Sequence, residues 1–346
     1  MNIYFLFFLL LIIITMICIK IKGFDYIKKN DKYLILIFIL LTLFLALKSE
    51  NVGVDADSYK KIFYDIAKFP FSKVYLYDRY EIGYKYLCKI FSLIWNNYQF
   101  FLFGISFLEM AGFYCFIKKY SKNYVFSLLL FITFETYTLT FGILRQAIAL
   151  SISLLAFNFL DKRKPIKFIL LVLLASLFHK TAAIFLLAYP FLFIKVNKKV
   201  IVIFTFIVIF TLLFGNDIVN FIMNYIYMPS TSTFNSGYGY KMIVLLYSIC
   251  IFIYIHFENL KKTDTSSNVL LLMLMLGNVI QCLAPTYKNT GRLVIYFFPF
   301  IDVLIPNTLE IIKNNRIKLI LEILMIVSLS IFFFVKTSNL LYETLI

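Results

Sequence analysis

Apolar runs long enough to cross a membrane recur along the whole chain, and they limit the folds open to it. Of the 346 residues, 62% are hydrophobic and 15% are charged, whereas soluble domains carry about 25% charged residues. A helix satisfies its own backbone hydrogen bonds in hydrocarbon and needs about 20 apolar residues to span it. A β-barrel would need alternating strands of about ten residues, which are not visible. We therefore predict an all-α, polytopic integral membrane protein with about 11–12 transmembrane helices.

The order of apolar and basic residues near the start predicts a retained first helix. Lysines follow the run at 3–19 instead of preceding it, which is the reverse of a cleaved signal peptide. The segment 84–95 is amphipathic and short, so we expect it at the membrane interface or re-entering the membrane. The apolar runs fall near 2–19, 33–48, 98–117, 124–141, 143–160, 168–194, 200–214, 241–257, 267–284, 293–309 and 318–335.

Basic connections predict the orientation, because short cytoplasmic loops are enriched in Lys and Arg. The short basic connections are 20–32, 118–123, 161–167, 195–199, 258–266 and 310–318. Placing all of them in the cytoplasm requires 168–194 to leave and return to the same side, as a broken, re-entrant hairpin with His179 and Lys180 at its turn. The alternative, one long helix, would put three later basic connections outside. A broken helix at membrane depth is tolerated where it lines a polar cavity.

The hairpin topology predicts one transmembrane domain over 1–346, with both termini outside. It also predicts two extracellular loops, an acidic one at 49–83 and one rich in Asn, Ser and Tyr at 215–240. The formal net charge of +16 is then explained by loop lysines that set topology and contact anionic lipids. We expect no nucleic-acid partner.

Cations from distant parts of the chain are predicted to meet at the outer face. Arg145, with Gln146 beside it, begins the helix 143–160, and Arg292 begins 293–309. His179 and Lys180 lie at the hairpin turn, and Arg79 closes the first outer loop. Such a set suits an anionic ligand, and pyrophosphate is the obvious candidate for the arginine forks. For each arginine taken alone, contact with lipid headgroups is as well expected as binding of an anionic ligand.

Carboxylates accompany these cations. Asp55 and Asp57 in the first outer loop would orient or deprotonate a hydroxyl, or ligate a hard cation, although loops also use Asp in turns. Glu135 lies among aromatic residues, where pairing with Arg145 and a catalytic role are equally expected. Two histidines on opposite sides cannot build a metal site, and no nucleotide-binding fingerprint is present. We expect neither a metal nor a cofactor.

Four short motifs in order resemble the EpsG family, whose members look like Wzy-type polysaccharide polymerases. The motifs are Gly-Xaa-Asp-Xaa-Asp-Xaa-Tyr (Gly53 to Tyr59), Glu-Xaa-Gly-Tyr (Glu81 to Tyr84), Leu-Arg-Gln-Xaa-Ile-Ala (Leu144 to Ala149) and Phe-His-Lys-Thr-Ala (Phe178 to Ala182). They cover roughly residues 1–195. Arg292 followed by Tyr296 fits more loosely, and the second half is otherwise generic hydrophobic sequence.

The resemblance implies a glycosyltransferase-type polymerase of capsular, exopolysaccharide or O-antigen repeat units at the outer face of the bacterial cytoplasmic membrane. Undecaprenyl-pyrophosphate-linked oligosaccharides would be donor and acceptor. Membrane lipids, a flippase and a chain-length regulator are the expected partners.

Roles for the site residues follow from the same resemblance. Arg145 and Arg292 would bind the pyrophosphate, assisted by Lys180 and Arg79. One of Asp55, Asp57, Glu81 and His179 would act on the acceptor hydroxyl, with Asp55 ranked first. Gln146, Tyr59, Tyr84 and Tyr296 complete the expected substrate-binding set. A lipid-linked oligosaccharide flippase, or an acyltransferase with His179 as its base, are the alternative functions.

Overall fold

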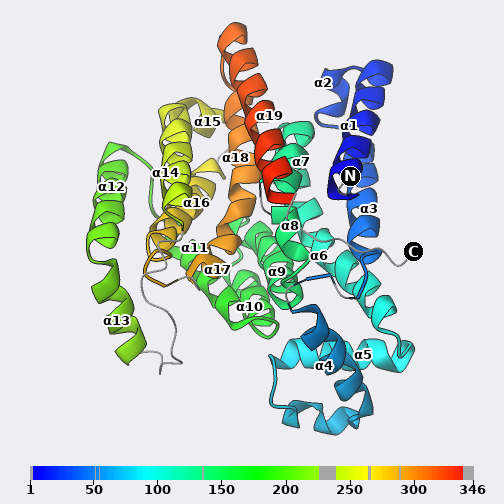
Figure 1. Ribbon diagram of the computed structural model, residues 1–346. Coiled ribbons are helices and arrows are strands. Elements are labelled where there is room, and N and C mark those ends of the chain that lie inside the picture. The colour runs from blue at the N-terminus through cyan, green and yellow to red at the C-terminus, as the bar shows by residue number, and fades with distance from the viewer. Residues whose placement is uncertain are drawn as a thin grey trace. The chain divides into compact units, whose positions relative to one another are not determined.

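Every regular element in the described part of the chain is a helix (Figure 1). The computed structural model describes residues 3–50, 52–53, 55–134, 136–225, 239–263, 266–287 and 290–337. The chain packs as two compact units, Met1–Leu186 with Leu319–Ile346 and Leu187–Lys318. The predicted all-α class is confirmed.

The first unit holds the N-terminal half of the chain and most of the last helix. Its elements are α1 (Ile3–Lys22), α2 (Phe24–Ile27), α3 (Asp31–Ala46), α4 (Ala56–Lys68), η1 (Phe71–Leu76), α5 (Ile82–Ile94), α6 (Tyr98–Tyr120), α7 (Tyr124–Thr133), α8 (Thr136–Thr140), α9 (Leu144–Asp161), α10 (Pro165–Ser176), η2 (Lys180–Leu187) and α19 (Asn315–Thr337).

Asparagine side chains begin several of these helices. Asn30 accepts from Tyr33 N at 3.0 Å before α3, Asn97 from Phe100 N at 2.9 Å before α6, and Asn123 before α7. An N-cap side chain satisfies one of the backbone donors that the first turn leaves free. These caps fix where each apolar run becomes a helix.

Four helices in the described residues are long and apolar enough to cross a membrane. They are α6, α9, Gly291–Glu310 and Asn315–Val335, and two bent pairs raise the number to six if each pair is one span. Shorter apolar helices include α7 and α10. The chain is therefore a polytopic, membrane-embedded helical protein.

The long run at 168–194 is broken, as predicted. Helix α10 ends at Ser176, and a turn carries the backbone to η2, which begins at Lys180. Phe178 N and His179 N both donate to Ala175 O, at 3.0 and 3.1 Å, and close the end of α10. The break thus lies at the polar step Phe178-His179-Lys180, where the sequence interrupts its apolar run.

Helices α6 and α9 pack closely at a glycine. Gly112 N donates to Ser151 Oγ at 2.9 Å, and Ser151 Oγ donates to Leu108 O at 2.7 Å. A Cβ on Gly112 would collide with the backbone and side chain of Ser151. Small residues that let helix backbones approach are typical of membrane interfaces. This contact fixes α9, whose first turn carries Arg145.

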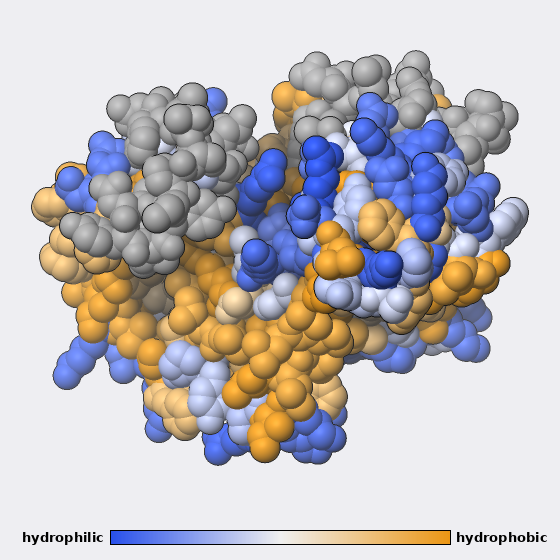
Figure 2. All heavy atoms as spheres, turned by 90° about the horizontal axis from the view of Figure 1, so that it is seen from below, coloured by the Kyte–Doolittle hydropathy of each residue, from blue (hydrophilic) through white to orange (hydrophobic). Residues whose placement is uncertain are grey.

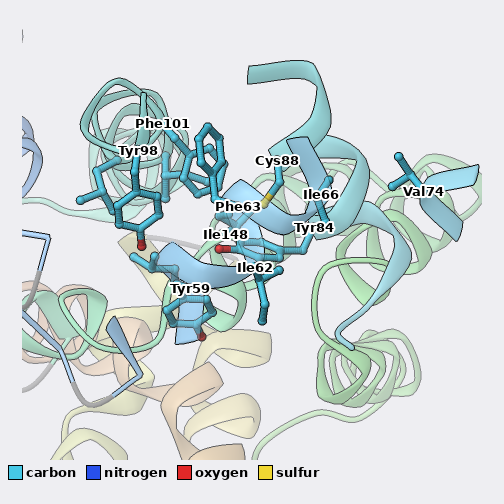
Figure 3. Packing of buried hydrophobic residues seen from close by; sticks show 13 residues of the cluster. Tyr59, Ile62, Phe63, Ile66, Val74, Tyr84, Cys88, Tyr98, Phe101 and Ile148 are labelled. Carbon is cyan, nitrogen blue, oxygen red and sulfur yellow. The ribbon is translucent and has the colours of Figure 1, made fainter. Parts of the chain in front are cut away.

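A separate layer, made of α4, η1 and α5, follows α3 in the chain. Helix α5 runs crosswise to α3, and Figure 2 shows hydrophilic side chains gathered on the face that this layer occupies. Its core packs aromatic and aliphatic side chains of α4 and α5 against α6 and α9 (Figure 3). The segment predicted at 84–95 is the amphipathic helix α5. The labelled members of the core are Tyr59, Ile62, Phe63, Ile66, Val74, Tyr84, Cys88, Tyr98, Phe101 and Ile148.

The second unit is built around α16. Asn278 of α16 donates to Ile243 O at 2.9 Å, and Asn268 accepts from Val196 N at 2.8 Å. The pairs α12–α13 and α14–α15 bend by 77° and 68°. Its elements are α11 (Ala188–Phe191), α12 (Lys198–Leu213), α13 (Gly215–Tyr225), α14 (Tyr240–Ile255), α15 (Phe257–Thr263), α16 (Ser267–Gln281), α17 (Gly291–Val294), η4 (Ile295–Phe297) and α18 (Phe298–Glu310). Of the predicted outer loop 215–240, residues 226–238 lie outside the described residues.

Candidate functional site

Arg145 is the centre of the polar cluster in the first unit. It occupies the first turn of α9, and its Nη1 donates to Glu81 Oε2 in an ion pair. The centre of its guanidinium lies 3.6 Å from the ring centroid of Tyr80 and 6.0 Å from that of Tyr59. A guanidinium held on one face by a ring and on one edge by a carboxylate has a fixed orientation.

The start of α9 lies beside this guanidinium. Ile143 at the N-cap makes no side-chain cap bond. Arg145 Nε is buried and has no hydrogen-bond partner in the described part of the chain. The free N–H groups and the dipole of a helix N-terminus both favour an anion. The arrangement therefore suits an anionic group with several oxygens.

Tyr80 adopts a backbone conformation that non-glycine residues rarely take, with φ of +66°. Such a conformation costs on the order of 1–3 kcal/mol, and it persists where the surroundings hold it in place. Here it places the Tyr80 ring over Arg145 and the next residue, Glu81, at the guanidinium edge.

The same loop is fastened to the break after α10. Gly83 N donates to Leu177 O at 2.8 Å, and Lys180 N donates to Glu81 Oε1 at 3.3 Å. A Cβ on Gly83 would lie 2.7 Å from Leu177 O, so only glycine fits without a shift. Glu81 thus connects Arg145 on α9 to the turn that carries His179 and Lys180.

A second glycine anchors the start of the layer formed by α4, η1 and α5. Gly53 has φ of +125°, and a Cβ there would lie 2.7 Å from Phe141 O. The ammonium of Lys48, which is 2% exposed, donates to the same carbonyl at 2.7 Å. The turn at 141–143 leads directly into α9, so these contacts help to position Arg145.

Asp55 lies beside the two tyrosines that face Arg145. It occupies the N-cap position of α4 without making a side-chain cap bond. Burial raises the pKa of Tyr59 to about 12, Arg145 opposes that rise, and the negative charge of Asp55 adds to it. Burial also raises the pKa of Tyr80, with Arg145 and Asp55 acting in the same opposed senses. Both phenols are therefore neutral at physiological pH.

A family model described as the EpsG family matches residues 31–345, nearly the whole chain. The chain belongs to the EpsG family. This is a Wzy-like polymerase family, and membership gives the chain a role in polysaccharide biosynthesis. No curated protein and no solved structure matches the chain.

The four EpsG-like motifs lie together in the first unit. Gly53 contacts the turn before the Leu-Arg-Gln motif, and Gly83 contacts the residue before the Phe-His-Lys motif. The ion pair of Glu81 with Arg145 joins two of the motifs directly. Motifs that are separated in the sequence therefore form one cluster in the structure.

The other predicted residues of the first unit differ in how far their side chains are buried. Asp57, Arg79 and the Lys180 side chain are exposed. His179 is half-buried, and its Nδ1 lies 2.5 Å from Thr181 Oγ1. Gln146 is buried in α9.

Tyr84 is fully enclosed in the core of the layer formed by α4, η1 and α5. Its ring packs on Tyr59 and Tyr80, at centroid distances of 5.6 and 5.8 Å. It therefore supports the two tyrosines nearest to Arg145 from behind.

Three predicted residues are not placed in this cluster. Arg292 lies in α17 and Tyr296 in η4, both in the second unit. The Arg292 side chain is exposed, and the Tyr296 side chain is buried. Glu135 lies outside the described residues, so its suggested pairing with Arg145 stays a prediction; the partner seen is Glu81.

Lys48 and Tyr80 were missed by sequence reasoning. A lysine at the outer end of an apolar run, against the expected charge bias, was the available signal for Lys48. Tyr80 stood between two selected residues, Arg79 and Glu81. In the described part of the chain, no three His, Cys, Asp or Glu side chains gather in the manner of a metal site.

Proposed function

We propose that this EpsG-family protein polymerises lipid-pyrophosphate-linked oligosaccharide repeat units at the outer face of the cytoplasmic membrane. Family membership supports a polymerase of polysaccharide. The lipid-linked donor, the outer face and the residue roles are our proposal.

The observation that carries the proposal is the state of Arg145. Its guanidinium is oriented by Tyr80 and Glu81, while its buried Nε–H lacks an acceptor in the described residues. An unsatisfied buried donor costs about 1–3 kcal/mol, which a ligand oxygen would relieve. A pyrophosphate oxygen at this place would also accept from the first turn of α9.

The proposed reaction is a single group transfer. The acceptor hydroxyl oxygen forms a bond to the anomeric carbon of the donor glycan, and the bond from that carbon to the pyrophosphate oxygen breaks. The bonding electrons leave with the lipid pyrophosphate, whose added charge Arg145 stabilises. The hydroxyl proton passes to a carboxylate. Charge stabilisation of this kind commonly supplies the largest share of catalysis.

Asp55 is the carboxylate that we assign to the proton. Glu81 is already committed to Arg145 and to Lys180 N, and Asp57 is exposed on α4. Asp55 makes no cap bond and lies near Tyr59 and Tyr80, whose neutral hydroxyls suit a sugar. In this scheme Glu81 positions Arg145.

Replacing Arg145 by alanine tests the proposal. We expect Arg145→Ala to lower polymer formation at least about 100-fold, with single repeat units remaining on lipid at the outer face. Arg145→Lys should retain part of the activity, because it keeps the charge but loses the fork. The measurement is a gel ladder of polymer together with analysis of lipid-linked units on each side of the membrane.

Arg316→Ala, at an exposed arginine at the start of α19, is the matched control and should make polymer normally. Full-length polymer from Arg145→Ala would refute the role of Arg145. Repeat units trapped inside the cell would indicate a flippase instead.

A further inference from the structure

Helix α5 turns its charged side chains inward and its apolar side chains outward. Lys85 and Lys89 are each only 6% exposed, and their ammonium groups donate to backbone carbonyls of the segment 67–77. The outward side chains gather on another side of the helix and on the residue that follows it. We call this set the apolar face of α5; Tyr86 in it is half-buried and the other five are exposed. Its members are Ile82, Tyr86, Ile90, Leu93, Ile94 and Trp95.

Helix α4, which packs against α5, has the usual arrangement for a surface in water. Its apolar residues fill the core that it shares with α5, while Asp57, Lys61 and Lys68 are exposed. Lysine is almost never buried without a reason, and a contiguous exposed apolar patch marks an interaction surface. None of the six side chains in the apolar face of α5 is charged. The layer formed by α4, η1 and α5 thus has a charged helix face and an apolar helix face.

The apolar face of α5 continues onto a membrane-spanning helix. The Trp95 ring lies 5.5 Å from the Phe100 ring in the first turn of α6. Phe103 and Phe107 follow on the same side of α6, and both are exposed. Because α6 is long and apolar enough to cross a membrane, these exposed phenylalanines face hydrocarbon. At its other edge the face is extended by exposed Phe71 of η1, whose ring lies 5.2 Å from that of Tyr86.

The contact between α5 and α6 indicates the depth of α5. A Cβ on Gly104 would collide with the Phe91 ring, so α5 packs closely on α6 at this glycine. Gly104 lies about 9 Å from the start of α6, at 1.5 Å per residue. The 23 residues of α6 extend over about 34 Å, slightly more than a hydrocarbon core of about 30 Å, so its ends reach the boundary. Amphipathic helices that lie in the interface are buried to about 5–10 Å.

We propose that the apolar face of α5, together with Phe71, lies in the boundary between the headgroups and the acyl chains of the membrane that the protein spans. The partner of this surface is the phospholipid bilayer, and the inference does not rest on the proposed function. Helix α5 runs crosswise to α3, as a helix in the plane of the membrane does (Figure 1). Tryptophan is enriched at this depth, and Trp95 ends the apolar face.

The proposal decides between the two placements that the sequence allowed for 84–95. Re-entry into the membrane would take the exposed charges of α4, which packs on α5, into hydrocarbon, where each charge is costly. Placement in the interface leaves those charges in water. Glu81 directly precedes α5 and pairs with Arg145. The bilayer would therefore hold this ion pair near the level of the headgroups.

The first experiment needs no substitution, because Trp95 is the only tryptophan of the chain. Its fluorescence is measured in the full-length protein reconstituted with phospholipids that carry bromine at defined depths, and with iodide in the water. We expect the strongest quenching from bromines nearest the headgroups and weak quenching by iodide. Strongest quenching from bromines at the bilayer centre would show re-entry. Quenching by iodide alone would place Trp95 in water, and quenching by neither would show that protein, such as a second copy of the chain, covers it. Each of these three results overturns the proposal.

The second experiment compares the two helix faces of the layer. In a functional variant with all five cysteines replaced, a nitroxide is attached at Ile90→Cys on α5 or at Lys61→Cys on α4. We expect oxygen, which concentrates in lipid, to relax the label at 90 more than a water-soluble nickel chelate does, and the reverse at 61. The same response at both positions contradicts the proposal. Neither experiment involves Arg145 or pyrophosphate, so their outcome is independent of the proposed function.

Discussion

Two motif glycines are positioned where the backbone of another segment leaves no space for a side chain. Gly53 faces Phe141 O, and Gly83 faces Leu177 O. Sequence reasoning used these glycines only to recognise motifs. Their spacing could not show what they touch, because Phe141 and Leu177 are far away in the sequence.

Gly83→Ala should impair the site because the added Cβ collides with Leu177. Backbone strain does not contribute, since Gly83 has no positive φ. Overpacking of this kind costs about 1–3 kcal/mol, and the shift would move Glu81 away from Arg145. We expect a lower unfolding temperature and weaker binding of inorganic pyrophosphate, measured on purified protein.

Gly23→Ala provides the comparison. Gly23 has φ of +84° but nothing within 4 Å of an added Cβ. Because its ψ of 153° puts it in a region that essentially only glycine adopts, the variant should lose about 1–3 kcal/mol of stability from strain and keep its pyrophosphate affinity. Unchanged affinity in Gly83→Ala would show that the loop contact does not support the site.

At the scale of elements, the start of α9 depends on Lys48, a lysine that follows α3. Lys48→Met removes the donor to Phe141 O while keeping the length of the side chain. We expect polymer formation to fall between about 10- and 100-fold, because small displacements of a binding group have effects of this size. Lys48→Arg should recover part of the activity. Polymer yield per folded protein is the measurement.

Lys60→Met is the control for this element. Lys60 pairs with Glu50 at a half-exposed site, and such pairs contribute at most about 1 kcal/mol. It should polymerise normally. If Lys48→Met is equally active, the anchor at Phe141 does not position Arg145.

Breaks within helices were predictable where polar residues cause them. The step at His179-Lys180 indicated the break in 168–194, and the structure has it there. The apolar run at 124–141 also contains a polar residue, Glu135, and α7 ends at Thr133 whereas α8 begins at Thr136.

For the whole molecule, the predicted orientation is a separate, testable statement. In a functional variant with all five cysteines replaced, Lys73→Cys in the first outer loop should react with a membrane-impermeant maleimide on intact cells. Lys162→Cys, in a basic connection, should react only after permeabilisation. Both positions are exposed. The reverse pattern would place the Arg145 cluster on the cytoplasmic side.

Composition and run length were sufficient to predict the helical membrane fold, because few alternatives satisfy a backbone in hydrocarbon. The cluster was only partly predictable. The predicted topology placed Arg145, His179 and Lys180 on one side of the membrane, but it suggested the nearby Glu135 as a partner of Arg145. Glu81, which pairs with it, is 64 residues away, and the strained φ of Tyr80 that presents it has no signature in the sequence.

Two lysines of α5 hold together the layer formed by α4, η1 and α5. Lys85 Nζ donates to Tyr75 O and Tyr77 O at 3.1 and 2.6 Å, and Lys89 Nζ donates to Ala67 O at 2.9 Å. No disulfide braces this layer, because all five cysteines of the chain are free thiols. The hydrogen bonds from the two ammonium groups to backbone carbonyls connect the segments of the layer instead. A reducing agent should therefore leave the layer intact, whereas acylation of these two amines would loosen it.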